Sequence, residues 1–224
     1  CFDHPVVRGA LSSILGPEYV MDAHRHGHHN VPHSKGMQWH KDDYWGNRKM
    51  LSHRPWYAMI FYYTQDVTED MGPSAIIPGS QHYYERLEDD SEYHLSICGK
   101  AGTMALIDYD IWHTAMANRS DLDRFMLKFL FYRMEVPEQP NWNVKNLDWE
   151  TPQNPSYPIL PSELLWKSAW NWLSGHPNQP LKDQQQSVKA VNETNELIKQ
   201  LQDSDYKLRM KAADALGSQG EKAL

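Results

Sequence analysis

Residues 1–136 carry short apolar and aromatic runs separated by Gly, Pro and Asp, and this rhythm limits the fold more than any other feature. Such runs, bounded by turn residues, are typical of β-strands in an antiparallel domain. The expected strands are Met37–Asp42, Trp56–Thr64, Ser74–Ile77, Thr103–Ile107 and Phe125–Arg133. One helix, Val6–Leu15, should precede them and end at Gly16-Pro17. The pattern predicts a mainly β domain.

The composition is that of a folded protein without a nucleic-acid partner. Forty per cent of the 224 residues are hydrophobic, which suffices for a core, and the net charge of −7 leaves no basic stripe for a phosphate backbone. No apolar run approaches the roughly 20 residues that span a bilayer, so we expect no membrane partner. Two cysteines, Cys1 and Cys98, favour a reduced, cytoplasmic protein. Because the chain starts at Cys1, we also expect an N-terminal truncation that could have removed a targeting signal.

Two further regions follow the β domain. Residues 137–180 are rich in proline and tryptophan and are expected to form a strap over the first domain, with an amphipathic helix that Ser162 caps and Gly175 ends. Residues 181–224 are polar and helical, with a helix at Val188–Leu201 and an alanine-rich stretch that ends at Gly217. This tail resembles one HEAT-like repeat, a candidate surface for a protein partner.

A single repeat cannot bury its own apolar face, so the tail predicts that the natural protein continues past Leu224. The alternative is an ordinary C-terminal helical hairpin.

The triplet His40-Lys41-Asp42 and the later His113 form a candidate metal site. Residues separated by one lie on the same face of a strand, so His40 and Asp42 can point at one ion while Asp43 faces away. Two imidazoles and one carboxylate make the facial triad of non-haem Fe(II) oxygenases.

Five more histidines form a dense cluster upstream of this triplet, and such clusters can bind metal. They are His24, His26, His28, His29 and His33. The Gly, Asn and Pro among them favour the alternative, an exposed loop near the mouth of a pocket.

Two segments support the triad reading by their order along the chain. Residues 69–82 read EDMGPSAIIPGSQH, a turn, a short apolar strand and a second turn. Residues 102–113 read GTMALIDYDIWH, a strand that delivers a histidine, and Arg124 follows eleven residues after it. Together with His-Lys-Asp, these segments resemble the phytanoyl-CoA dioxygenase family over residues 5–135.

The resemblance implies a double-stranded β-helix, the jelly-roll or cupin-like fold, with flanking helices and the HEAT-like hairpin after it. It implies that His40, Asp42 and His113 bind Fe(II) and that Arg124 binds the far carboxylate of 2-oxoglutarate, a role that suits a planar guanidinium. The implied activity is a dioxygenase that uses O2 to hydroxylate a small organic or acyl substrate and releases succinate and CO2. Fold-level analogy does not select the substrate.

Other candidates are weaker because ordinary packing explains them equally well. Gln38, Phe61 and Tyr63 are candidates for lining the co-substrate site, and Tyr44 and Trp45 for contacting the substrate. Ala115 stands where some family members have a hydroxyl residue that helps to hold the carboxylate, and Thr114 or Tyr132 could substitute for it.

Two rival functions remain open. The chain could be a non-catalytic cupin-like binding module or scaffold, or a cupin that uses another metal and gives Arg124 no dicarboxylate to bind.

Overall fold

The computed structural model describes most of the first 176 residues and part of the tail. The described residues are 1–42, 53–83, 85–86, 90–144, 146–153, 158–160, 163–176, 189–205, 208–209, 212–213 and 215–216. Asp43, Tyr44 and Trp45 lie outside them, as does Ser162, so the predictions for these residues stay predictions.

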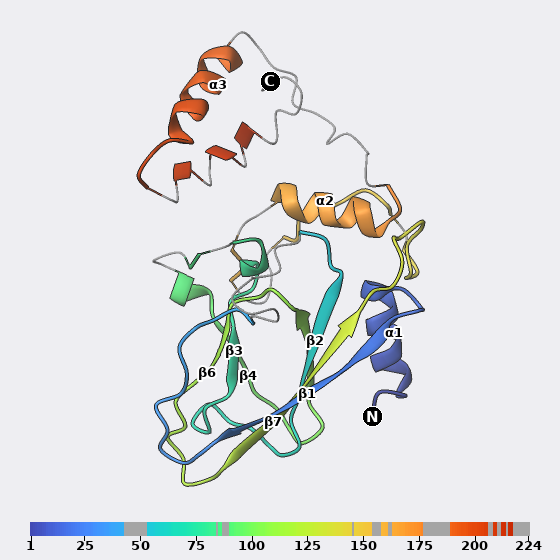
Figure 1. Cartoon of the computed structure of the whole chain (residues 1–224), viewed down its shortest axis with the longest axis vertical. Helices are drawn as coiled ribbons and strands as arrows, with labels where there is room; N and C mark the ends of the chain where they lie inside the picture. The colour runs from blue at the N-terminus through green and yellow to red at the C-terminus, as the bar shows by residue number, and fades with distance from the viewer. Residues whose placement is uncertain are drawn as a thin grey trace.

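Two antiparallel sheets form the body of the molecule (Figure 1). The four-stranded sheet has the order β1-β7-β2-β5, with bounds β1 Val20–Asn30, β7 Arg124–Tyr132, β2 Tyr57–Tyr62 and β5 Met104–Asp108. The three-stranded sheet has the order β4-β3-β6, with bounds β4 Leu95–Ile97, β3 Ser74–Ile76 and β6 His113–Ala115. Two short 3-10 turns, Ser80–His82 and Asp90–Tyr93, separate β3 from β4. The expectation of a mainly β, antiparallel fold is confirmed.

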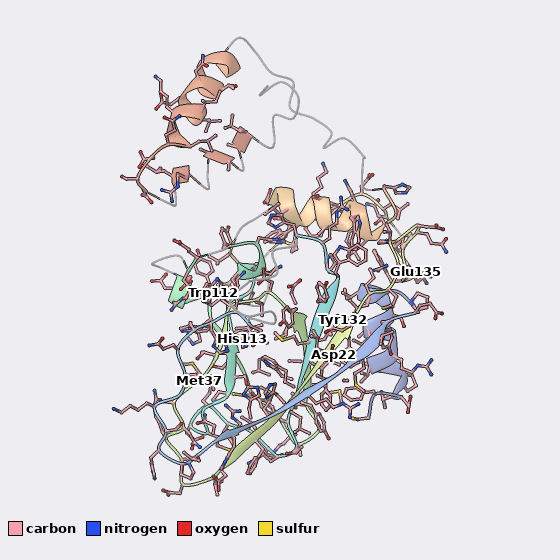
Figure 2. The ribbon with its side chains drawn as sticks, in the orientation of Figure 1. Asp22, Met37, Trp112, His113, Tyr132 and Glu135 are labelled. Carbon is pink, nitrogen blue, oxygen red and sulfur yellow. The ribbon has the colours of Figure 1, made fainter. Side chains whose placement is uncertain are left out.

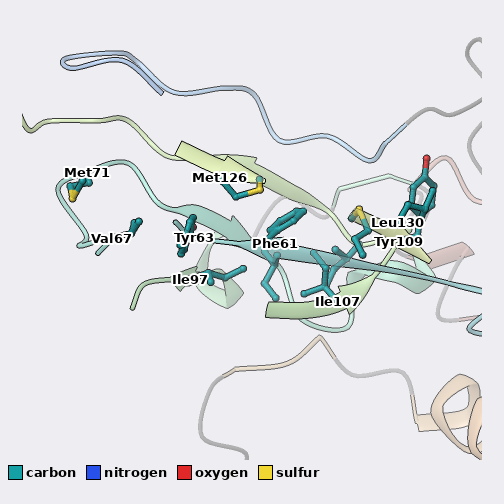
Figure 3. Packing of buried hydrophobic residues seen from close by; sticks show 12 residues of the cluster. Phe61, Tyr63, Val67, Met71, Ile97, Ile107, Tyr109, Met126 and Leu130 are labelled. Carbon is teal, nitrogen blue, oxygen red and sulfur yellow. The ribbon is translucent and has the colours of Figure 1, made fainter. Parts of the chain in front are cut away.

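Strand β2 of the four-stranded sheet is buried on both faces because each face packs against a different partner. On β2, Met59 and Phe61 join the core between the two sheets, with Ile76 of β3 and Ile97 of β4 (Figure 3). The alternate residues of β2 face the other way and pack with α1. A strand covered on both faces reads as a continuous apolar run, which is the pattern that identified β2 in the sequence.

Helix α1, Pro5–Leu15, covers the outer face of the four-stranded sheet. Proline suits the first turn of a helix, where its missing N–H leaves no bond unmade. Leu11 and Leu15 are buried in one cluster with Phe131 of β7. The helix ends at Gly16, whose φ of 83° is available to glycine at little cost, so the predicted helix and its end are confirmed.

The predicted strand Met37–Asp42 is wrong, because one extra residue interrupts its pairing. His40 and His113 exchange backbone hydrogen bonds of 3.0 and 2.9 Å, but the next bond joins Met37, instead of Gln38, to Ala115. The pairing therefore shifts by one residue between these two points, as in a β-bulge, and only an isolated bridge remains at His40.

The expected loop in the histidine-rich segment is also wrong, since most of it is β1. This strand pairs with β7 from Val20 to Asn30, with an irregularity between Met21 and Arg25. It lies at the edge of the sheet formed by the described strands, where polar side chains reach solvent at little cost. His33 lies past the strand end, with a φ of 58°.

Helix α2, Glu163–Leu173, attaches the tryptophan-rich segment to the start of β2 (Figure 1). Trp172 is buried, its ring centre 5.1 Å from that of Trp56 and 5.3 Å from the Arg133 guanidinium carbon. Trp170 Nε1 donates a hydrogen bond of 2.7 Å to the Leu147 carbonyl. The predicted end of this helix near Gly175 is confirmed by that residue's φ of 80°.

Helix α3, Lys189–Gln200, falls within the helix expected at the start of the tail. The following stretch is described only in pieces, of which 208–209, 212–213 and 215–216 are helical. The HEAT-like pairing of two helices is not confirmed and remains a prediction. Among the described residues, no helix has the length and apolar character needed to cross a membrane. Cys1 and Cys98 are exposed free thiols.

Candidate metal centre

His40, Asp42 and His113 converge although the two histidines are seventy-three positions apart in the sequence. One nitrogen or oxygen of each side chain lies within 4.8 Å of the others. The backbone bridge between His40 and His113 sets the two imidazoles side by side, with ring centres 4.4 Å apart. Asp42 Oδ1 lies 3.7 Å from His113 Nε2. The described residues contain no other such group of three.

Backbone carbonyls fix the orientation of both imidazoles. The Nδ1 atom of His113 lies 3.0 Å from the Ile111 oxygen, and that of His40 lies 2.9 Å from the Gln38 oxygen. A carbonyl oxygen only accepts hydrogen bonds, so each Nδ1 must carry the proton and donate it. Each Nε2 then keeps its lone pair for a metal ion, which is the usual arrangement of histidine ligands.

The electrostatic environment gives two of these groups the protonation states that a metal requires. Burial lowers the pKa of His113 to about 4, so its ring is neutral near pH 7. Burial alone would raise the pKa of Asp42, but the positive charge and hydrogen bond of Lys128 outweigh it and hold the pKa below its usual value. A neutral imidazole and an ionised carboxylate bind a cation without first losing a proton.

Arg124 lies at the first position of β7 and is fully buried. Its Nε and Nη2 atoms donate hydrogen bonds of 3.0 and 2.7 Å to the Gly72 carbonyl. Its Nη1 atom is buried without a hydrogen-bond partner among the described residues. Gly72 has a φ of 65°, and a Cβ there would lie 2.5 Å from the Met116 carbonyl oxygen. Glycine is therefore required at this point beneath the guanidinium.

Arg124 and the two histidines line one small cavity. Its lining residues are His28, Met37, His40, Phe61, Ser74, His113, Thr114, Ala115, Arg124, Met126 and Lys128. A buried guanidinium, one of whose N–H groups has no partner among the described residues, thus shares a cavity with two potential metal ligands. This combination suits an anion that reaches from a metal ion to Arg124.

The structure sorts the weaker sequence candidates. Phe61 lines the cavity, with its ring centre 5.6 Å from that of His113. Tyr63 does not line it, and its hydroxyl accepts a 2.8 Å hydrogen bond from the Ser74 N–H. Gln38 is exposed, and Met37 takes the expected place because of the one-residue shift in pairing.

The two hydroxyl groups considered as substitutes at Ala115 are both used elsewhere. Thr114 lines the cavity, but its hydroxyl donates a 2.7 Å hydrogen bond to the Met37 carbonyl. The Tyr132 hydroxyl bonds with Asp22, and Figure 2 shows this pair on β7 and β1, separate from His113 on β6.

Two further residues line the cavity. His28 belongs to the histidine-rich segment that the sequence offers either as a metal site or as an exposed loop; its Nε2 atom is buried without a partner among the described residues, and burial lowers its pKa to about 4. Lys128 lies four residues after Arg124 on β7, and its Nζ is 2.7 Å from Asp42 Oδ2. Alternation along the strand from Arg124 would have placed Lys128 on the same face.

Comparison with known families gives a match over more than half of the chain. Residues 1–126 match the family described as phytanoyl-CoA dioxygenase (PhyH), a stretch that contains His40, Asp42, His113 and Arg124. A search of curated protein sequences found no match.

Several solved structures are similar to part of the chain. The non-heme monooxygenase ThoJ in its apo form is 16% identical with a TM-score of 0.48, over 61% of this chain and 57% of ThoJ. AviO1 from Streptomyces viridochromogenes Tue57 is 12% identical with a TM-score of 0.48, over 58% of each chain. HygX from Streptomyces hygroscopicus, with nickel, 2-oxoglutarate and hygromycin B bound, is 13% identical with a TM-score of 0.44, over 61% of this chain and 64% of HygX. In each of these three structures the matched part is less than two thirds of the compared chain.

Proposed function

Because the chain belongs to the phytanoyl-CoA dioxygenase family, we propose that it is an Fe(II)/2-oxoglutarate-dependent dioxygenase. The proposed reaction hydroxylates a small organic or acyl substrate with O2 and releases succinate and CO2. The observation that carries the proposal is the cavity that Arg124 lines together with His40 and His113, because the Nη1 atom of Arg124 has no partner among the described residues.

In this proposal His40, Asp42 and His113 would hold Fe(II) through two imidazole nitrogens and one carboxylate oxygen. The donor set fits, since imidazole nitrogens and a carboxylate oxygen are the ligands that non-haem iron uses in such sites. Bound iron would supply the redox chemistry that couples 2-oxoglutarate oxidation to hydroxylation. The protein supplies orientation, through the carbonyls that fix both imidazoles.

Arg124 would bind the far carboxylate of 2-oxoglutarate through Nη1, while Gly72 holds the other two nitrogens in place. A guanidinium held in this way loses little conformational freedom on binding. Phe61 and Met126 give the cavity apolar walls, which exclude water and strengthen charge interactions inside it.

The substrate class stays broad in this proposal. Tyr44 and Trp45 remain candidates for substrate contact, and they lie outside the described residues. We also propose the division into a β domain at 1–136, a strap at 137–180 and a tail at 181–224 that could bind a protein partner.

The experiment is an anaerobic titration of the protein with Fe(II) and then with 2-oxoglutarate, followed by the visible metal-to-ligand charge-transfer band. We expect the band in the wild-type protein and its loss in Asp42→Ala and His113→Ala. His29→Ala is the matched control, because His29 lies on β1 and pairs with Asp123 on the exposed surface.

Succinate formed in air, with and without added Fe(II), then tests turnover. If the folded wild-type protein binds Fe(II) but shows no band with 2-oxoglutarate, the result would favour the alternative function, a cupin that uses another metal. A band without any succinate, for all substrates tried, would favour the non-catalytic module.

A further inference from the structure

Lys128 places a positive charge beside the candidate metal ligands. It lies on β7 opposite Phe61 of β2 and His26 of β1, so the hydrogen bonds of two neighbouring strands hold its backbone. Its Nζ atom is 2.7 Å from Asp42 Oδ2, and the two side chains are only 15% and 17% exposed. The pair is therefore largely shielded from water and from salt.

The two oxygens of Asp42 face different neighbours. Oδ1 lies 3.7 Å from His113 Nε2, on the side where the ligand atoms converge, and Oδ2 accepts the hydrogen bond from Lys128. The ammonium group does not occupy the oxygen that faces the histidines. An ion held by Oδ1 and both imidazoles is therefore compatible with the Lys128–Asp42 pair.

Charge at this site affects metal and anion in opposite directions. Two neutral imidazoles and one carboxylate would leave a divalent ion with a single net positive charge. The Lys128 ammonium offsets the carboxylate, so the occupied site would keep both positive charges. A nearby cation repels a metal ion and attracts an anion, and both effects are large where water is mostly excluded.

Arg124 and Lys128 lie on the same face of β7 with Met126 between them, and all three line the cavity. The cavity thus has one cationic side chain at each of two positions along a single strand. In the proposed function Arg124 binds the far carboxylate of 2-oxoglutarate, and Lys128 lies beside the proposed metal ligand Asp42.

We propose that Lys128 is a positioning residue whose positive charge offsets the negative charge of Asp42. As a result, the metal site binds its ion less tightly and binds an anionic 2-oxo acid more tightly. The inference rests on the proposed function for the identity of the anion. Its metal-binding half does not depend on that identity.

The test compares wild type with Lys128→Met, Lys128→Arg and Lys100→Met. Methionine keeps a long apolar stem without charge, and arginine keeps the charge. Lys100 is the matched control because it loses an equivalent ion pair, with Asp66, on the exposed surface. Calorimetry measures the dissociation constant of Ni(II), and then that of 2-oxoglutarate for the Ni(II)-loaded protein, at one pH and ionic strength. Circular dichroism checks that each variant is folded.

For Lys128→Met we expect about tenfold tighter Ni(II) binding and about tenfold weaker 2-oxoglutarate binding, with both constants close to wild type in the other two variants. Opposite shifts separate charge balance from a structural role, since a disordered Asp42 would weaken both. Weaker or unchanged Ni(II) binding in Lys128→Met would overturn the inference. If the Ni(II)-loaded wild type does not bind 2-oxoglutarate, the proposed function and the co-substrate half of the inference fail together, and the Ni(II) constants still decide the other half.

Discussion

The two faces of the β1-β7-β2-β5 sheet come from the same strands and differ in chemistry. The outer face packs Ala58, Ile60 and Phe131 against Leu11 and Leu15 of α1. The inner face also has an apolar core, but three polar side chains interrupt it where the cavity lies: His28, Arg124 and Lys128.

Because side chains alternate between the two faces of a strand, one strand contributes residues that stabilise the fold to the outer face and cavity residues to the inner face. Burial of apolar side chains on the outer face stabilises the fold, by about 1.5–3 kcal/mol for a large aliphatic or aromatic residue. Burial of Arg124, with one nitrogen left without a partner among the described residues, costs stability. Such a cost is expected where a buried polar group is kept for ligand binding. Substitutions on the outer face should therefore change the free energy of unfolding, and substitutions on the inner face should change ligand affinity.

The largest effect is expected on the outer face, for Phe131→Ala. This change removes a fully buried ring from the contact between α1 and the sheet and should lower the free energy of unfolding by about 3–5 kcal/mol. Chemical denaturation measures it. Ni(II) affinity, measured where the variant is still folded, should stay at the wild-type value; a large loss of affinity would show that the two faces are coupled.

A smaller effect, of opposite kind, is expected on the inner face for Arg124→Leu. Loss of the guanidinium should raise the 2-oxoglutarate dissociation constant about a hundredfold, because a charge-assisted pair contributes roughly 1.5–3 kcal/mol. Ni(II) binding should persist. Unfolding stability should change little, because removal of the unpartnered Nη1 offsets the loss of the two hydrogen bonds to the Gly72 carbonyl. Unchanged 2-oxoglutarate affinity would exclude Arg124 from the co-substrate site.

The smallest effect is expected for Asp108→Asn, which tests a polar exception beside the outer face. Asp108 pairs with Ala58 across the sheet, and burial raises the pKa of its carboxyl to about 7. The folded protein therefore holds this proton more tightly than the unfolded chain, so wild-type stability should fall as pH rises from about 4 to 7. Asparagine removes this dependence and keeps an acceptor for the Asp110 N–H.

We expect Asp108→Asn to be more stable than wild type at pH 8 by on the order of 1 kcal/mol and no more stable at pH 4. Urea unfolding at both values measures the difference. The same gain at both values would assign the effect to packing instead of charge.

The sequence predicted the elements that local patterns determine. Helix α1, the central strand β2 and helix α2 each carry a complete local signal, and their structures follow it. The grouping of His40, Asp42 and His113 could be expected from residue types and order, although their role as ligands remains a prediction.

The sequence did not predict features that depend on distant partners. Lys128 meets Asp42 across eighty-six residues, and β1 owes its extended form to pairing with β7. The three-residue strands β4 and β6 are too short for a periodic signal. Met37 takes the place expected for Gln38 because a single bulge shifts the pairing by one residue. The alternation of residues along one strand does not reveal such a bulge.

The position of β7 has a consequence for molecular recognition. β7 lies between β1 and β2, and hydrogen bonds to both neighbours fix its register. Four residues along a strand place the Cα atoms of Arg124 and Lys128 about 13 Å apart. In the proposed function, this fixed spacing would limit the length of the anion that can reach from the metal ligands to Arg124.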